Sequence, residues 1–157
     1  MATTHQVTAT TLVDAPVGLI WSLLCDTTRY AEWLESTIEV HSGDRVARLG
    51  SIYEERTRLS GFWTSKTRWE VVELRAPSVI ALEGFGVPAV RRILVEFGVE
   101  PVEAGADVSS TYSYTLRYGL LGSVIEFGFK NNVNAEQRRS LRTLAILAER
   151  EAGTREC

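Results

Sequence analysis

The chain has 157 residues, which is the usual size of one domain and is enough to bury a substantial hydrophobic core. Hydrophobic residues make up 45% and charged residues 24% of the chain, so the composition excludes the disordered, collagen-like and low-complexity classes. With 17 basic against 20 acidic side chains and a formal net charge of -3, the chain has no electrostatic reason to bind nucleic acid, and we expect one domain over residues 1–157 without such a partner.

Cysteine content and the N-terminal sequence indicate the compartment. Cys25 and Cys157 are too few for a disulfide scaffold or for a four-ligand zinc site. Residues 1–16 contain no basic region followed by an apolar run, and no stretch of about 20 apolar residues occurs anywhere. We therefore expect a cytoplasmic protein that does not insert into a membrane.

The N-terminal part of the chain predicts one strand and two short helices. Apolar and polar side chains alternate over residues 6–13, which is the period of a strand. Pro16 then stands in the first turn of a helix, where its missing N–H has no cost, and apolar residues at helical spacing continue this helix to Asp26. Asp26 is typical of an N-cap for a second short helix that holds Tyr30 and Trp33.

From Thr37 to Tyr118 the hydrophobic period changes to two, which is typical of strands. Breaks rich in glycine, proline and serine divide this stretch into six strands, at residues 42–44, 60–61, 76–78, 84–86 and 103–105. Turns this short join antiparallel strands, since a parallel pair needs a crossover of about a dozen residues or more. One long helix follows, from about Leu120 to Arg150, with a length of about 45 Å. The pattern therefore predicts an α+β fold with a seven-stranded antiparallel sheet and a long C-terminal helix.

The alternation of residues in the middle strands predicts a sheet with one solvent-exposed face and one face rich in aromatic side chains. The inner face carries aromatic rings together with hydroxyl groups and two charges, Glu55 and Arg91. A dry core would avoid so many polar groups, because each costs roughly 1–3 kcal/mol when it is buried without a partner. We infer an internal cavity. The alternative is that the polar ends of the tyrosine and tryptophan side chains reach the rim of the inner face, while the small polar groups bond to the backbone. On the long helix, an apolar stripe faces the sheet: Val133, Gln137, Leu141, Leu144 and Ala148.

Several short motifs, in their order and spacing, resemble the START/Bet v1-like superfamily and, within it, the bacterial polyketide cyclase/dehydrase group. They span nearly the whole chain: Asp14-Ala-Pro16 with Ile20-Trp21, Asp26 with Tyr30 and Trp33, residues 69–74 with Pro77, Gly105, and residues 119–122 with Leu141, Leu144 and Ala148. The resemblance implies a helix-grip fold, in which the curved sheet wraps the long helix and leaves an apolar cavity for a lipid-like, steroid-like or polyketide-like molecule. Members of the superfamily include cyclases, lipid carriers and self-protection proteins, so the fold alone does not choose the function.

The sequence contains no motif for metal, triad or nucleotide chemistry. It has two histidines and neither HExxH nor a paired CxxC, so we expect no metal site. Ser42 and Asp44 lie beside His41 in one turn, whereas the partners of a triad converge from distant parts of a chain. Gly84-Phe-Gly86 leads into a strand and not into a helix, so it does not predict a dinucleotide site. We expect no cofactor, and the sequence assigns no catalytic residue.

We predict that a ligand contacts side chains of the inner face and of the long helix: Tyr53, Glu55, Trp63, Thr67, Trp69, Arg91, Val95, Phe97, Tyr112, Tyr114, Phe129 and Val133. If Glu55 and Arg91 meet, they would polarise a ligand carbonyl or hold a carboxylate headgroup; the alternative places both at strand ends in water. The tyrosines would present hydroxyl groups to ligand oxygens while their rings form apolar wall, and the alternative for them is packing at the rim.

Three functions remain open for such a cavity. The leading one is binding of one hydrophobic small molecule, with the option of acting on it by orientation as a cofactor-independent polyketide cyclase or aromatase. The second is a carrier, sequestering or self-protection protein with the same cavity and no turnover. The third is a protein-interaction module whose cavity is small or collapsed. We expect a monomer or a homodimer.

Overall fold

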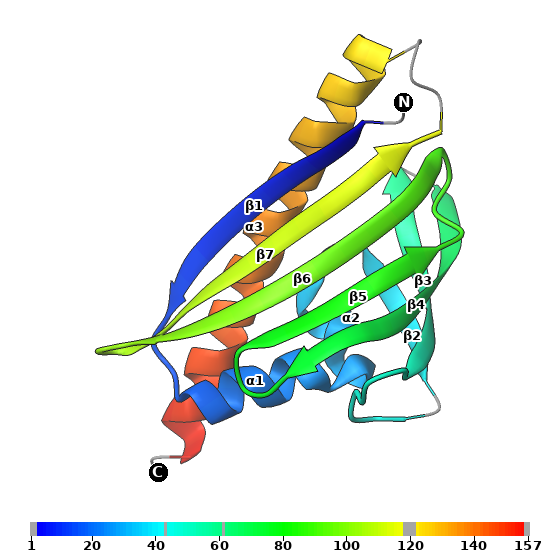
Figure 1. Cartoon of the computed structure of the whole chain (residues 1–157). Helices are drawn as coiled ribbons and strands as arrows, with labels where there is room; N and C mark the ends of the chain where they lie inside the picture. Colours follow the sequence, from blue (N-terminus) through cyan, green and yellow to red (C-terminus); the bar gives the residue numbers. More distant parts are fainter. Residues whose placement is uncertain (1–2, 43, 61, 118–121, 156–157) are drawn as a thin grey trace.

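The computed structural model describes residues 3–42, 44–60, 62–117 and 122–155. Its elements confirm the predicted order (Figure 1). The first strand and the short helices are β1 (Thr4–Val13), α1 (Val17–Cys25), the 3-10 turn η1 (Thr27–Arg29) and α2 (Tyr30–Trp33). The later strands are β2 (Thr37–Ser42), β3 (Ile52–Ser60), β4 (Trp63–Arg75), β5 (Val79–Phe85), β6 (Val90–Val102) and β7 (Gly105–Leu116).

The long helix α3 (Gly122–Arg155) closes the described chain. Its predicted start at Leu120 lies outside the described residues. Its end is five residues beyond the predicted Arg150, because residues 151–155 continue the helical hydrogen bonding.

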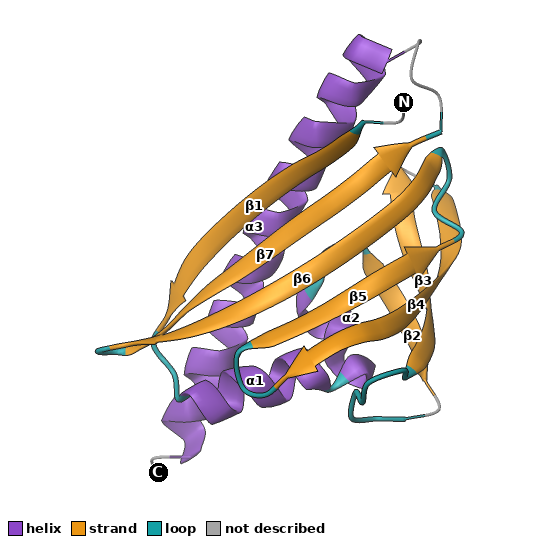
Figure 2. Ribbon diagram, viewed as in Figure 1, coloured by secondary structure: helices purple, strands orange, loops and turns teal. Residues whose placement is uncertain are grey.

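All seven strands form one antiparallel sheet in the order β1-β7-β6-β5-β4-β3-β2. The first strand therefore pairs with the last, and the other strands follow one another as a meander. The sheet curves around α3, with α1 and α2 at one end of it (Figure 2). This arrangement confirms the predicted helix-grip architecture, including the two short helices after the first strand.

Side-chain hydrogen bonds shape the corner between α1 and α2 as the sequence predicts. The Asp26 carboxylate accepts from the backbone N–H of Thr28 at 3.2 Å and from the hydroxyl of Thr28 at 2.5 Å, so Asp26 caps the turn. The buried Tyr30 hydroxyl donates to the Leu24 carbonyl at 2.6 Å, and the Tyr30 ring packs edge-on against Trp33. The corner is thereby fixed beneath the sheet.

The core lies between the concave face of the sheet, α1 and the later turns of α3. The predicted stripe of α3 is confirmed, because its five members are at most 9% exposed: Val133, Gln137, Leu141, Leu144 and Ala148. Within it, the Gln137 amide donates to the carbonyls of Val7 at 3.2 Å and of Ser110 at 3.0 Å, which joins α3 to β1 and β7. Among the described helices, none combines the length and the hydropathy needed to span a membrane.

Candidate functional site

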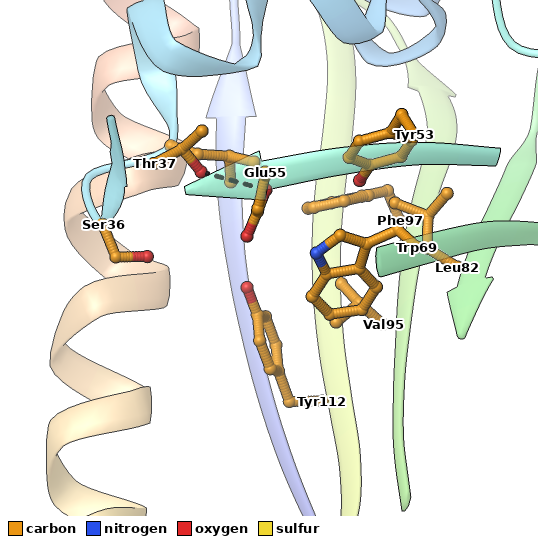
Figure 3. Close-up of a pocket in the computed structure, with 10 residues that line it drawn as sticks. Ser36, Thr37, Tyr53, Glu55, Trp69, Leu82, Val95, Phe97 and Tyr112 are labelled. Atoms are coloured by element: carbon orange, nitrogen blue, oxygen red, sulfur yellow. Dashed lines mark hydrogen bonds between the residues drawn. The ribbon is translucent and has the colours of Figure 1, made fainter. Parts of the chain in front are cut away.

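A pocket lies on the concave face of the sheet, beside the segment that joins α2 to β2 (Figure 3). Side chains from six strands, β2 to β7, and from this segment line it. Its walls are mainly apolar at Leu34, Trp69, Leu82, Val95 and Phe97, and its polar atoms come from Ser36, Thr37, Tyr53, Glu55 and Tyr112. The mixture of rings, hydroxyl groups and one carboxyl group matches the inner face that the sequence predicts.

The pocket is small as it stands. About 20 Å³ of it is open to the centre of a water molecule, and the whole hollow, including the part open to solvent, is about 300 Å³. A space of this size holds about one water molecule. The side chains around it are therefore close to contact across the pocket.

Strand alternation and register bring the main lining residues together. Tyr53 and Glu55 are two residues apart on β3, so they share a face, and they are 2% and 6% exposed. Trp69 on β4 is the antiparallel partner of Tyr53, while Tyr112 on β7 is the partner of Val95 on β6. The lining set is thus fixed by ladder pairs at the centre of the sheet.

Glu55 is a buried carboxyl group without a cationic partner among the described residues. One oxygen accepts from the Thr57 hydroxyl at 2.8 Å, and the other accepts from the Thr37 hydroxyl at 3.3 Å. Burial raises the pKa of Glu55, and the nearby Glu136 carboxyl adds to the rise, while hydroxyl and indole donors act in the opposite direction. The group therefore keeps its proton to a higher pH than an exposed glutamate does.

A second carboxyl group, that of Glu136 on α3, lies on the other side of the α2–β2 segment. It accepts from the Ser36 hydroxyl at 2.5 Å. Burial raises the pKa of Glu136, and repulsion from Glu35 adds to the rise, whereas the hydrogen bond from Ser36 and the charge of Arg139 lower it. Two carboxyl groups with raised pKa values therefore meet near one end of the pocket.

Two tyrosines bring hydroxyl groups to the same end. In Figure 3 the Tyr112 hydroxyl points toward the Glu55 carboxyl group. Burial raises the pKa values of Tyr112 and Tyr53, and the neighbouring carboxyl groups raise them further, so both phenols stay protonated at neutral pH. Chemically, this end offers carboxyl groups that accept a proton or a hydrogen bond and phenols that donate one.

The indole of Trp69 has an unused donor in this pocket. Its Nε1 is buried and has no hydrogen-bond partner of ordinary geometry among the described residues, although it lies near enough to Glu55 to lower the pKa of that group. A buried indole N–H normally finds a partner. The donor is therefore free for an acceptor atom that enters the pocket.

Half of the predicted ligand-contact residues line the pocket: Tyr53, Glu55, Trp69, Val95, Phe97 and Tyr112. The others lie elsewhere. Thr67, Tyr114 and Val133 are buried in other parts of the core, and Phe129 is half-buried with its ring centre 4.8 Å from that of Tyr114. Among the side chains that the structure describes, none from α3 lines this pocket, so its floor is the sheet and its cover is the α2–β2 segment.

The expected inward orientation of Arg91 is wrong, since the side chain is exposed. The ladder between β6 and β7 shifts register between Val90 and Arg92, which marks a β-bulge. A bulge inserts one residue and breaks the alternation of faces, so Val90 and Ile93 are both buried while Arg91 faces water. Glu55 and Arg91 therefore do not meet, and the carboxylate-headgroup hypothesis loses its cation.

The expected inward orientation of Trp63 is also wrong. Its side chain is 76% exposed, although Thr67 and Trp69 of the same parity are buried. Trp63 is the first residue of β4, where the pairing with β3 shifts register between Arg58 and Ser60. Trp63 therefore stands at the irregular end of the β3–β4 hairpin, where the alternation of strand faces does not predict which side chains are buried.

Sequence reasoning missed five residues of this region: Leu34, Ser36, Thr37, Leu82 and Glu136. Leu82 carried a usable signal, because it shares its strand face with the buried Ile80. The segment from Leu34 to Ser36 has no period, and its place depends on contacts with α3 that are distant in sequence. No local pattern could have found it.

A family model described as "Polyketide cyclase / dehydrase and lipid transport" matches residues 4–149 of the chain. Among curated proteins, no significant match to the sequence is found. The family match confirms the resemblance drawn from the sequence motifs.

Solved structures share the fold at low sequence identity. The di-domain ARO/CYC StfQ of the steffimycin biosynthetic pathway superposes with a TM-score of 0.80 at 16% identity, over 96% of this chain and 52% of its own, so this chain spans about half the length of StfQ. The Zhui aromatase/cyclase from Streptomyces sp. R1128 gives a TM-score of 0.68 at 21% identity, over 99% of this chain and 97% of its own. Ara h 8.0201 gives 0.67 at 8% identity, over 93% and 98%. At these identities the likeness shows the fold alone.

Proposed function

We propose that this chain, which belongs to the polyketide cyclase/dehydrase and lipid transport family, binds one hydrophobic small molecule in the pocket on the concave face of its sheet. A polyketide-like, lipid-like or steroid-like ligand, a cytoplasmic location and a monomeric or homodimeric state belong to the same proposal. It requires neither a metal nor a cofactor.

The observation that carries the proposal is a set of incompletely used polar groups inside an aromatic pocket. The buried Trp69 N–H lies near Glu55 and has no hydrogen-bond partner of ordinary geometry among the described residues. Glu55 is a buried carboxyl group that no cation among these residues neutralises. Each such group in a finished core would cost roughly 1–3 kcal/mol, so their presence together favours a place for a ligand over simple packing.

Binding requires the pocket to open, because pockets for ligands of this class have volumes of about 300–1,000 Å³. The cover is the segment from Leu34 to Ser36, which lies between α2 and β2 and outside both. Side-chain contacts hold it to α3: the Glu35 backbone N–H donates to the Ser140 hydroxyl at 3.0 Å, and the Ser36 hydroxyl donates to Glu136. Release of these hydrogen bonds, at about 1 kcal/mol each, is much easier than separation of strands.

Ligand uptake tests the proposal directly. Purified protein is incubated with Nile red, a neutral apolar dye, and native mass spectrometry measures any small molecule that co-purifies from cells. We expect one dye or metabolite per chain. Val95→Phe fills the pocket and should weaken uptake by roughly tenfold or more, whereas Leu94→Phe, one residue away and on the other face of β6, should not. Equal uptake by both variants would contradict the proposal.

A second candidate function is catalysis in the same pocket, as a cofactor-independent cyclase or aromatase. The observation that favours it is the placement of the Tyr112 hydroxyl opposite the Glu55 carboxyl group (Figure 3). As a carboxylate, Glu55 would take a proton from the carbon next to a ligand carbonyl, while Tyr112 would donate to the oxygen of the enolate that forms. A raised pKa suits a group that must exchange protons near neutral pH.

A protein-interaction module remains the rival to both. The small volume of the pocket in this structure favours it. The two readings predict different outcomes of the uptake experiment. If neither Nile red nor any metabolite binds, and the Val95→Phe variant behaves as the parent does, the interaction module becomes the better account.

A further inference from the structure

The polar end of the pocket is rich in hydrogen-bond acceptors and carries no positive charge of its own. Glu55 lies inside it, and Glu136 lies just behind Ser36. Among the described residues, no ion pair includes Glu55, and the nearest basic group to Glu136, Arg139, is exposed and bonded to Glu35 at 2.6 Å. Arg91, which the sequence placed beside Glu55, faces solvent. No cation among the described residues is therefore in place to stabilise Glu55 as a carboxylate.

Each group that packs around Glu55 can be named by its element. Tyr53 and Thr57 lie on the same strand, Thr37 lies on β2, Trp69 on β4 and Tyr112 on β7. From the described side chains of α3, Glu136 and Arg139 bring charge toward this end. A carboxylate offers about four lone-pair sites, and the two threonine hydroxyls use two of them.

The walls next to this carboxyl group are aromatic. The rings of Tyr53, Trp69, Phe97 and Tyr112 all line the pocket. Aromatic faces attract cations, most strongly when water is excluded, and a buried carboxylate is stable only with a positive partner. A desolvated carboxyl group between aromatic rings is a poor site for an anion and a good site for an ammonium group.

We infer that the hydrophobic ligand of this pocket carries a basic nitrogen, which binds as an ammonium group against Glu55 between the aromatic rings. The inference rests on the proposed function and specifies its ligand class: an apolar amine, and neither a fatty acid nor another ligand with an anionic headgroup. The Trp69 N–H is then free to donate to an oxygen or other acceptor next to the nitrogen.

A matched series of probes tests the inference. 2-Naphthylmethylamine, 2-naphthalenemethanol and 2-naphthoic acid have the same ring system with a cationic, a neutral and an anionic headgroup. Calorimetric titration at neutral pH gives three dissociation constants, and the NMR signal of the Trp69 indole N–H reports occupancy of the pocket. We expect the amine to bind at least tenfold more tightly than the alcohol, and the acid to bind most weakly.

Two variants test whether the preference for the amine comes from the charge of Glu55. Glu55→Gln keeps the volume and removes the charge, so it should bring the affinity for the amine to that for the alcohol and leave the alcohol nearly unchanged. Glu54→Gln, the matched control, removes a charge from the exposed face of the same strand and should change none of the three constants. If Glu55→Gln does not fold, Glu136→Gln is tested in its place. We then expect a smaller loss of affinity, and for the amine only.

The outcomes separate the two proposals. If all three probes shift the Trp69 signal but the alcohol or the acid binds as tightly as the amine, the inference is overturned and the proposed function stands. If no probe shifts the signal of Trp69, the proposed function is overturned, and the inference falls with it. The inference is also overturned if Glu54→Gln and Glu55→Gln lose the same affinity for the amine, since the effect would then come from the net charge of the protein.

Discussion

The indole ring of Trp69 lies directly on Gly84, its partner in the neighbouring strand β5. A Cβ atom at position 84 would stand 2.8 Å from Cζ3 and 2.9 Å from Cη2 of the indole, and 2.7 Å from Cγ2 of Ile93. Distances this short do not occur between carbon atoms in packed proteins. Gly84 therefore provides the space in which Trp69 lies flat on the sheet with its N–H toward Glu55.

The first prediction is that Gly84→Ala moves the indole and damages the pocket. The added methyl group must displace either Trp69 or Ile93, both of which are buried. We expect a loss of about 1–3 kcal/mol in the free energy of unfolding and weaker uptake of Nile red. Urea unfolding and dye titration measure the two effects.

Gly18→Ala is the control for this substitution. No atom lies within 4 Å of a Cβ built at position 18, and Gly18 is inside α1, so alanine should raise stability by up to about 1 kcal/mol and leave dye uptake unchanged. If Gly84→Ala resembled Gly18→Ala in both measurements, the close packing of Trp69 on Gly84 would not matter for the pocket.

The second prediction concerns the pH dependence of stability. The pKa of Glu55 is raised in the folded state, so its contribution to stability is fully present below the pKa of the unfolded chain and is lost as pH rises through the folded pKa. Glu136 acts with the same sign. Asp26 and Glu32 have lowered pKa values, so their contributions change at lower pH and leave this window unaffected. Stability should therefore fall as the pH rises above 4.5, the ordinary pKa of a glutamate.

Between mildly acidic and neutral pH, Glu55→Gln should flatten this fall in stability, because glutamine does not ionise. The variant should gain stability relative to the parent as the pH rises. Urea unfolding at both pH values measures the difference, with Glu54→Gln as the exposed control on the same strand. A Glu55→Gln profile parallel to that of the parent would mean that the carboxyl group is not held in a desolvated site.

The third prediction concerns the hydrogen bonds that connect α3 to the sheet. Gln137 is 2% exposed, and its amide nitrogen faces the carbonyls of Val7 and Ser110. Gln137→Ala leaves these acceptors without their donor and leaves a cavity, so we expect a loss of about 2–3 kcal/mol. Gln6→Ala, on the exposed face of β1, should change stability by less than about 0.5 kcal/mol. Similar losses for the two variants would refute a special role for Gln137.

The fourth prediction separates binding from turnover. Tyr112→Phe keeps the ring and removes the hydroxyl that points toward Glu55. If the protein cyclises a linear polyketone, the variant should bind the chain within about twofold of the parent and turn it over roughly a hundredfold more slowly. Dye competition gives the affinity, and chromatography of the products gives the rate. Unchanged turnover would remove Tyr112 from any catalytic role.

Strand periodicity predicted most of the residues on the concave face of the sheet. It failed where the pairing between neighbouring strands is irregular. Tyr53, Glu55, Trp69 and Tyr112 lie in regular antiparallel pairs, so alternate positions share a face and parity is enough to place them. Arg91 lies in a bulge, which cannot be recognised from the residue pattern alone, and the alternation of faces fails there.

The cover of the pocket could not be predicted for a different reason. Glu35 and Ser36 are neither helical nor strand-like in pattern, and their position is set by contacts with α3, about 100 residues later in the chain. Glu136 lies next to the predicted stripe residue Gln137 on the helix, and it is half-buried where it accepts the hydrogen bond from Ser36. Burial created by such a long-range contact leaves no local signal.

The most direct test of a ligand pocket at the centre of this sheet is the indole region of a ¹H–¹⁵N NMR spectrum, recorded with and without 2-naphthylmethylamine. The four tryptophans give separate N–H signals that substitution to phenylalanine assigns. The account predicts a saturable shift of the Trp69 signal, while the signal of Trp63, exposed and outside the pocket, stays in place. A shift of Trp63 without one of Trp69 would contradict it, because the probe would then bind the outer surface and not the pocket.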